Sequence, residues 1–445
     1  MAVRWNDFYK EVQMSTPHKT LILGCASTGA KFTPRNHYIT GDQLLDSICT
    51  GATIHASEQA IVDEAIELYE SGCRYYHYHA RNPLTREQTT DNEIYQSVSR
   101  TIQRACKDTL LSFGASRNGR EVQDNIKKFG EWERVSQCAL PLHFGGAHFV
   151  TIQAAIELQV ICDMERKLRK FDIEYLSSAQ FSQDINSYTP SDRVVKATME
   201  TNSTSKGADY GSTSPLIQFQ IYRNAIAARQ QLGLFHEVEW VQLTRSYGMT
   251  RFAVEHPALR LGSSGQLNII LLFGFSSRLP FPQTYEEFCN IVDIAKSLEY
   301  DLANPNEIKR KVTITVGAAV MPQHAELHYQ PVDVGPQKGT PMCALRRLAT
   351  YAAQPDSKVD ILRVGMEDTP YSVDNEGRVH MGDNLQLLHI ALEQVTANGA
   401  SIETAPESII HRMGLDLVRT EYLATQRQTP LGDCGPTSLY QETVL

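Results

Sequence analysis

The sequence predicts an α/β protein built as a (β/α)8 TIM barrel with insertions. Short apolar segments rich in β-branched and aromatic residues alternate with amphipathic helical segments, and eight such strands are expected along the chain. Strands joined by crossover helices pair in parallel. No internal repeat or low-complexity linker interrupts the alternation. An open, doubly wound sheet is the alternative, but eight strands fit a closed barrel better.

Each element rests on a local pattern. Ser57 is a good N-cap, apolar residues then recur at helical spacing, and Gly72 ends that helix. Further helices are expected at 215–232, 284–298, 341–353 and 384–397. The strands are expected at 20–25, 73–81, 109–114, 173–178, 237–243, 267–275, 312–317 and 360–364.

The expected organisation is one large domain with polar ends. Its parts are a lead-in at 1–18, a single barrel over 19–416 with insertions around 120–215 and 245–265, and a C-terminal arm at 417–445. A structureless stretch as long as 184–213 is usually functional or mobile.

Composition excludes several classes of protein. The 445 residues include 42 basic and 51 acidic side chains, for a net charge of −9, without a Lys/Arg run typical of nucleic-acid binding. No apolar run approaches the roughly 20 residues needed to cross a bilayer, and the first residues lack the apolar core of a secretory signal. Nine scattered cysteines without a Cys-x-x-Cys pair argue for a reducing cytoplasm and against a thiolate zinc site.

Two predicted strand ends carry metal-binding residue types. In 73–81, His77 and His79 lie on one face of a strand, roughly 7 Å apart. The last strand is followed by Glu367 and Asp368. Catalytic groups of such barrels sit at the carboxyl ends of the strands, and two imidazoles with one carboxylate leave an open position on a zinc ion. Ordinary histidines and a helix-capping aspartate are the alternative interpretation.

Three other residues are candidates for roles beside the metal. Arg363 has the same strand parity as Glu367, so its guanidinium should point with the carboxylate, either as a structural ion pair or to bind an acidic substrate. Ser112 ends the third strand, where it could donate to an oxyanion or cap a turn. Glu239 needs a partner if it is buried, but could also face outward.

The residues at these strand ends resemble a known family. The segments 72–83 (Gly-Cys-Arg-Tyr-Tyr-His-Tyr-His-Ala-Arg-Asn-Pro), 90–95 and 363–368 (Arg-Val-Gly-Met-Glu-Asp) are similar to signature segments of the β-keto acid cleavage enzymes, which include 3-keto-5-aminohexanoate cleavage enzyme. Segments 28–30, 111–115, 403–407 and 414–415 are similar too. The resemblance covers roughly 20–120 and 235–415.

The resemblance implies a zinc-dependent barrel enzyme, usually a homotetramer. Such an enzyme condenses a β-keto acid with acetyl-CoA and releases acetoacetate and a new acyl-CoA. The residues at matching positions are His77, His79 and Glu367 as zinc ligands, Arg363 and Asp368 for carbanion formation, Ser112 and Glu239 as assisting polar groups, and Ser177 at the substrate carboxylate.

One position departs from the family pattern. The family member that acts on an amine-tailed substrate has a carboxylate just after the Gly-Ala of the first loop, where this chain has Lys31. A lysine would repel an ammonium group, so we expect an anionic or polar substrate tail. Lys31 pointing into solvent is the alternative.

Two other functions are compatible with a metal-binding barrel. An amidohydrolase-like hydrolase also uses His-x-His, but it needs further histidines on strands five and six, and the expected strands 237–243 and 267–275 contain none. A non-catalytic barrel that serves as a binding scaffold is the other. Such a scaffold would still bind its partner after its metal is removed.

Overall fold

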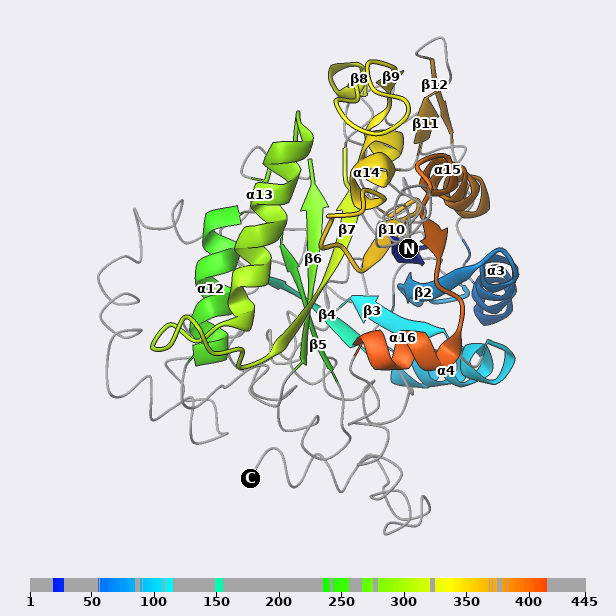
Figure 1. The fold of residues 1–445 in the computed structure, drawn as a ribbon. Helices are drawn as coiled ribbons and strands as arrows, with labels where there is room; N and C mark the ends of the chain where they lie inside the picture. Colours follow the sequence, from blue (N-terminus) through cyan, green and yellow to red (C-terminus); the bar gives the residue numbers. More distant parts are fainter. Residues whose placement is uncertain are drawn as a thin grey trace, which may run out of the picture.

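The computed structural model describes only part of the chain. The described residues are 19–27, 55, 57–84, 89, 91–106, 109–114, 149–154, 235–240, 243–255, 266–274, 279–320, 325–367, 369, 371–373, 378–381 and 383–413. These residues contain the parallel sheet, several helices that cover it and most of the candidate site (Figure 1).

The parallel strands follow one another around the sheet in chain order. Strand β10 pairs with β7 on one side and with β1 on the other, so the described pairings form a closed ring. At this seam Leu23 lies opposite Leu362. The short β13 (Ser401–Ile402) pairs with the first residues of β1. The ring consists of β1 (Thr20–Ala26), β2 (Cys73–Tyr78), β3 (Leu110–Gly114), β4 (Phe149–Ala154), β5 (Phe235–Trp240), β6 (Gln266–Phe273), β7 (Lys311–Ala318) and β10 (Ile361–Val364).

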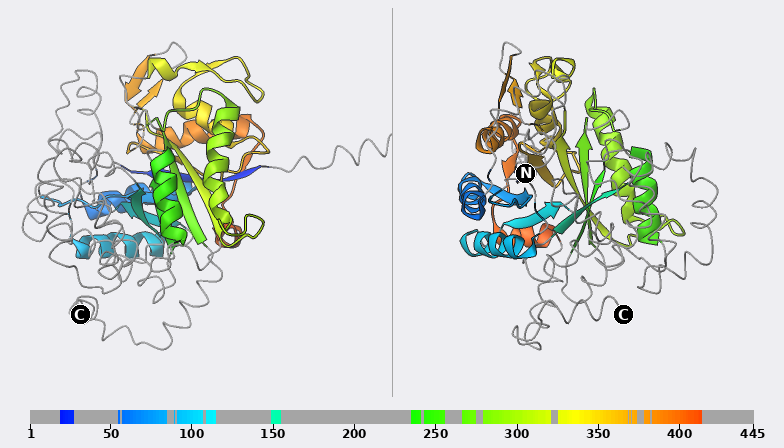
Figure 2. Two further views of the ribbon diagram at one scale, coloured as in Figure 1. Left: turned by 90° about the vertical axis from the view of Figure 1, so that its left-hand side faces the viewer. Right: turned by 180° about the vertical axis from the view of Figure 1, so that it is seen from behind.

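Helices pack around the outside of this sheet, as Figures 1 and 2 show from three directions. They are α3 (Glu58–Glu70), α4 (Asn92–Ala105), α12 (Leu243–Glu255), α13 (Tyr285–Lys296), α14 (Ala344–Ala352), α15 (Asn384–Ala397) and α16 (Pro406–Met413). Short 3-10 helices η2 (Ser297–Glu299) and η4 (Glu326–His328) and the antiparallel pairs β8–β9 (Gln330–Pro331 with Pro341–Met342) and β11–β12 (Tyr371–Val373 with Val379–Met381) complete the described structure.

The helices begin where the sequence provides caps. Ser57 accepts a hydrogen bond from the backbone N–H of Ala60 at 3.2 Å, as expected for an N-cap. Asp383 caps α15 in the same way through Gln386 at 2.7 Å. The predicted α/β class with a parallel sheet is therefore confirmed. The segments that follow β3 and β4 lie outside the described residues, so the complete (β/α)8 barrel stays a proposal.

Several expected segments differ from the structure or lie outside it. The strand between β3 and β5 is β4 (Phe149–Ala154), inside the expected insertion around 120–215, whereas the expected strand 173–178 lies outside the described residues. The run Phe-Val-Thr-Ile-Gln-Ala has the β-branched character of a strand. The lead-in, the C-terminal arm, helix 215–232 and most of 120–215 are also outside. The expected insertion around 245–265 overlaps α12.

The main apolar core lies between the sheet and the helices. On β6, for example, Leu267, Ile269 and Leu271 belong to this core, while Ile270 and Leu272 form a separate small cluster with Ala319. Alternate residues of one strand therefore face two different environments. No helix in the described part of the chain has the length and apolar character needed to cross a membrane.

Candidate metal centre

The two histidines of the predicted motif come from the end of β2. His77 lies in the strand and His79 follows it, two residues on, so both imidazoles project from the same face. The strand end is fixed to its neighbour by a hydrogen bond of 2.8 Å from the N–H of Ser27 to the carbonyl of His77. Both side chains are buried, with exposed fractions of 1% and 4%. The sequence prediction that they share a face is confirmed.

Glu367 reaches the histidines because the chain turns sharply after β10. Gly365 has φ +129°, and a Cβ at this position would lie 2.1 Å from the carbonyl oxygen of Ala26. Only glycine fits without moving the backbone of β1. The next residue, Met366, donates its N–H to Asn384 Oδ1 at 2.8 Å, which ties the turn to the start of α15. The turn therefore directs Glu367 toward β2.

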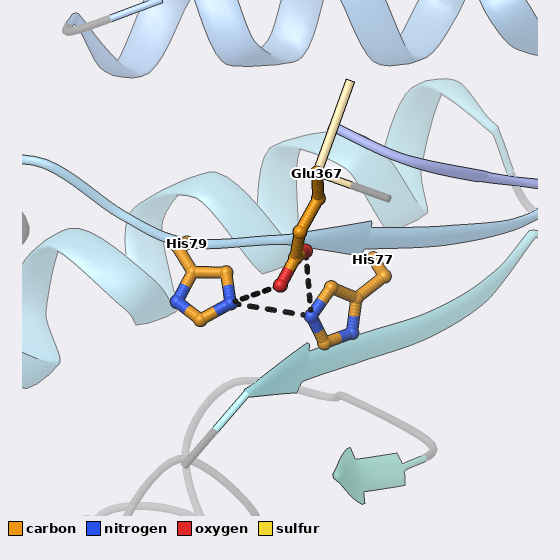
Figure 3. Close-up of side chains that lie close together, drawn as sticks. All are labelled: His77, His79 and Glu367. Atoms are coloured by element: carbon orange, nitrogen blue, oxygen red, sulfur yellow. Dashed lines mark hydrogen bonds and ion pairs between the residues drawn. The ribbon is translucent and has the colours of Figure 1, made fainter. Parts of the chain in front are cut away.

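Figure 3 shows Glu367 pointing between the two imidazoles. Its carboxylate oxygens lie 3.2 Å from His77 Nε2 and 3.2 Å from His79 Nε2, and the two Nε2 atoms are 3.3 Å apart. Tetrahedral zinc with ligands at about 2.0–2.1 Å places each pair of donors about 3.3 Å apart. The spacing of the three donors therefore suits one ion. Within the described residues, these three side chains form a cluster able to hold a metal.

Charge in this cluster is balanced by neighbouring groups. Burial alone would raise the pKa of the Glu367 carboxyl, but the nearby His79 and His77 outweigh it and hold that pKa well below its usual value. Arg363, fully buried, lies 3.7 Å from Glu367 and 3.9 Å from Glu239. The predicted direction of Arg363 is thus confirmed, and Glu239 faces inward beside it.

A buried polar network surrounds His77 on the side away from Glu367. His77 Nδ1 lies 2.9 Å from Ser112 Oγ, and Ser112 lies 2.6 Å from Glu237 Oε1. Tyr75 and Asn268 also contact Glu237, at 2.9 Å and 2.6 Å. From the sequence we expected a role for Glu239 but not for Glu237. Its signal was a second charged residue of the same parity in a buried strand.

Three predicted site residues cannot be placed against this geometry. Asp368, Lys31 and Ser177 lie outside the described residues, as does the loop at 28–30. The expected roles of these residues therefore stay predictions. The structure brings together His77, His79, Glu367, Arg363, Glu239 and Ser112.

Comparison with protein families supports the resemblance noted in the sequence. The family model "beta-keto acid cleavage enzyme" matches residues 54–188, the segment that carries both histidines. The predicted resemblance to this family is therefore confirmed. No curated protein matches the chain significantly.

Solved structures show only distant similarity. An apo structure of ObcA has 12% identity and a TM-score of 0.45, covering 81% of this chain and 65% of ObcA. A binary complex of ObcA with oxaloacetate has 13% identity and a TM-score of 0.42, covering 81% of this chain and 67% of that protein. The chain thus spans about two thirds of the length of ObcA, and similarity at this level supports no conclusion about activity.

Proposed function

We propose that this protein is a zinc-dependent acyltransferase that cleaves β-keto acids, built on a complete (β/α)8 barrel. The observation that carries the proposal is the cluster of His77, His79 and Glu367, whose donor spacing of 3.2–3.3 Å suits a tetrahedral ion. Three protein ligands leave one coordination position open, as in catalytic zinc sites. The family match over residues 54–188 supports the choice of β-keto acids as substrates.

In the proposed net reaction two acyl groups exchange places. The acetyl group leaves the sulfur of acetyl-CoA and becomes bonded to the α-carbon of the β-keto acid, which gives acetoacetate. The original acyl group breaks from that carbon and becomes bonded to the CoA sulfur. Zinc, when bound, supplies a Lewis acid that polarises a carbonyl oxygen.

The side chains around the cluster would bind and orient the substrate. Arg363 is fully buried 3.7 Å from Glu367, and its fixed guanidinium can pair with a substrate carboxylate. Asp368, adjacent to the ligand Glu367, is proposed as the base that removes the α-proton. Lys31 is proposed to favour an anionic or polar tail, and Ser177 to contact the substrate carboxylate. A cytoplasmic location and a homotetramer or homodimer stay predictions.

A metal hydrolase of the amidohydrolase type is less consistent with the site. In the structure β5 begins at Phe235 and so includes His236, which the expected strand 237–243 did not. His236 is at the amino end of this strand, whereas the metal cluster lies at the carboxyl ends of β2 and β10. The histidine that this class requires at the carboxyl end of strand five is therefore missing from the described β5.

The proposal is tested with purified protein, acetyl-CoA and a panel of β-keto acids, monitoring acetoacetate and bound metal. We expect about one zinc ion per chain and steady acetoacetate release. His79→Ala should abolish stoichiometric zinc and lower kcat/KM by about 10²–10³, because several kcal/mol of charge stabilisation are lost.

The exposed His389 on α15 provides the matched control. His389→Ala should leave both zinc content and activity unchanged. Metal-free protein that still releases acetoacetate, or equal losses in the two variants, would contradict the proposal.

A further inference from the structure

A line of buried hydrogen bonds leads from the metal cluster into the interior of the sheet. His77 on β2 lies directly opposite Ser112 on β3, and Ser112 Oγ bridges from His77 Nδ1 to Glu237 Oε1 on β5 at 2.9 Å and 2.6 Å. All three residues are at most 1% exposed. At such burial each polar group needs a partner of matching type, so the direction of each hydrogen bond matters.

Glu237 accepts hydrogen bonds from several sides. Tyr75 donates its phenolic O–H to Glu237 Oε1 at 2.9 Å. Asn268 Oδ1 accepts from Thr313 at 2.9 Å and from Thr315 at 3.2 Å. The amide nitrogen of Asn268 must then face Glu237, at 2.6 Å. These contacts suit an ionised carboxylate, which only accepts.

Because Glu237 only accepts hydrogen bonds, it determines where the hydroxyl proton of Ser112 points. A serine hydroxyl has one proton, and at 2.6 Å from Glu237 Oε1 that proton points to the carboxylate. Ser112 Oγ then offers only lone pairs to His77 Nδ1, so Nδ1 carries the imidazole proton and donates. A neutral imidazole protonated on Nδ1 has its free lone pair on Nε2. That is the atom 3.2 Å from Glu367 and 3.3 Å from His79 Nε2.

We infer that Glu237, acting through Ser112, is a positioning residue that holds His77 in the tautomer able to bind the metal. The inference rests on the proposed metal site and adds to it a residue that does not touch the ion. It also assigns Ser112 a different task from donating to an oxyanion, because its proton is used on Glu237. Hydrogen bonds to the far nitrogen of a ligand histidine commonly fix its orientation and tautomer.

Replacing the Glu237 carboxylate by an amide should reverse the direction of the hydrogen bonds from Ser112 to residue 237 and from His77 to Ser112. In Glu237→Gln the side-chain NH2 can donate to Ser112 Oγ, and the Ser112 proton is then free to point to His77 Nδ1. His77 would keep its proton on Nε2, where it blocks metal binding. Glu239→Gln is the matched control: it removes the same charge two residues along β5, beside Arg363.

The first measurement is zinc affinity by chelator competition. Glu237→Gln should weaken zinc binding about 10–100-fold, the usual effect of losing an outer partner of a ligand, and more than Glu239→Gln does. Ser112→Ala should cause a similar loss. The double variant should lose no more than the larger single loss, because both changes break the same line of bonds.

The second measurement needs no metal. Nitrogen-15 NMR of histidine-labelled apo-protein, with His77 assigned from the His77→Gln variant, should show a proton on Nδ1 of His77 in the wild type and the neutral Nε2–H tautomer in Glu237→Gln. If Glu237→Gln does not fold, Ser112→Ala carries the affinity test alone.

The outcomes separate the two proposals. A wild-type protein that binds no zinc overturns the metal site. A wild-type protein that binds zinc, with Glu237→Gln or Ser112→Ala binding it equally well, or with an Nε2–H tautomer at His77, leaves the metal site standing and overturns the role of Glu237.

Discussion

The two faces of the sheet differ sharply in chemistry although the same strands build them. On β6, Leu267, Ile269 and Leu271 face the helices and join the main apolar core. Between them, Asn268 points the other way and donates to Glu237. Successive residues of one strand therefore face either the apolar core or the polar interior of the ring.

The main apolar core and the buried charges lie on opposite faces of the sheet. Burying apolar side chains between sheet and helices stabilises the fold by roughly 1.5–3 kcal/mol for each large side chain. The inner face instead buries Glu237, Glu239, Glu367 and Arg363, each at most 5% exposed. Buried charges cost stability unless they are paired, so these four groups stabilise the fold less than the apolar core does.

Removing a charge from the inner face should have the largest effect on stability. Arg363→Met should lower the free energy of unfolding by about 3–5 kcal/mol in chelator-treated protein, because Glu239 and Glu367 then stay buried without the guanidinium beside them. Urea unfolding measures the loss. Arg346→Met, which removes the half-buried partner of the exposed Glu393, should cost less than about 1 kcal/mol. Equal losses in the two variants would contradict the prediction.

On the outer face, truncating a buried apolar side chain should reduce stability by leaving a cavity. Leu271→Ala should lower the free energy of unfolding by about 2–5 kcal/mol, since Leu271 is fully buried in the main core. Zinc affinity should not change, because the side chain points away from the metal cluster. Leu302→Ala, at a 62% exposed position, is the control and should be nearly neutral. A change in zinc affinity in Leu271→Ala would show that the two faces are coupled.

A third test concerns Lys19, a half-buried charge that precedes β1, at the end of that strand away from the metal cluster. Burial first, and then the charge of Arg412, lower the pKa of Lys19 to about 8, while its ammonium donates to the carbonyls of Ser357 and Val359. The unfolded chain, with a lysine pKa near 10.4, binds more protons between about pH 8 and 10, so stability from this group rises with pH.

The difference in free energy of unfolding between the wild type and Lys19→Met should therefore increase, in favour of the wild type, by on the order of 2 kcal/mol from pH 8 to pH 10. Lys338→Met, at an exposed position, should show no such gain. If the free energy of unfolding of the wild type, relative to Lys19→Met, falls as the pH rises, the lowered pKa of Lys19 is refuted.

Much of the fold and the metal cluster could be predicted from the sequence. Strand bounds for β1, β7 and β10 agree within about one or two residues, because each is a dense apolar run flanked by polar or small residues. The convergence of His77, His79 and Glu367 could be predicted because strand parity and the common edge of parallel strands suffice.

The surrounding network could not be found in this way. Ser112 and Glu237 are 125 residues apart, and their contact depends on the pairing of β3, β4 and β5. No local sequence pattern predicts the register between these strands, and the fourth strand was expected at 173–178 and not at β4. Glu237 and Glu239 have the same parity and differ only in their partners across the sheet. The sequence could therefore identify a Glu-x-Glu pair without showing which member serves His77.

The order of the ligands along the chain has a consequence for biosynthesis. His79 and Glu367 are separated by 288 residues, and the strand that delivers Glu367 is the one that closes the ring against β1. A chain growing on the ribosome carries both imidazoles long before the carboxylate exists. At the proposed metal site, full affinity can therefore arise only after β10 has been synthesised and has paired with β1, so metal binding would report that the ring has closed.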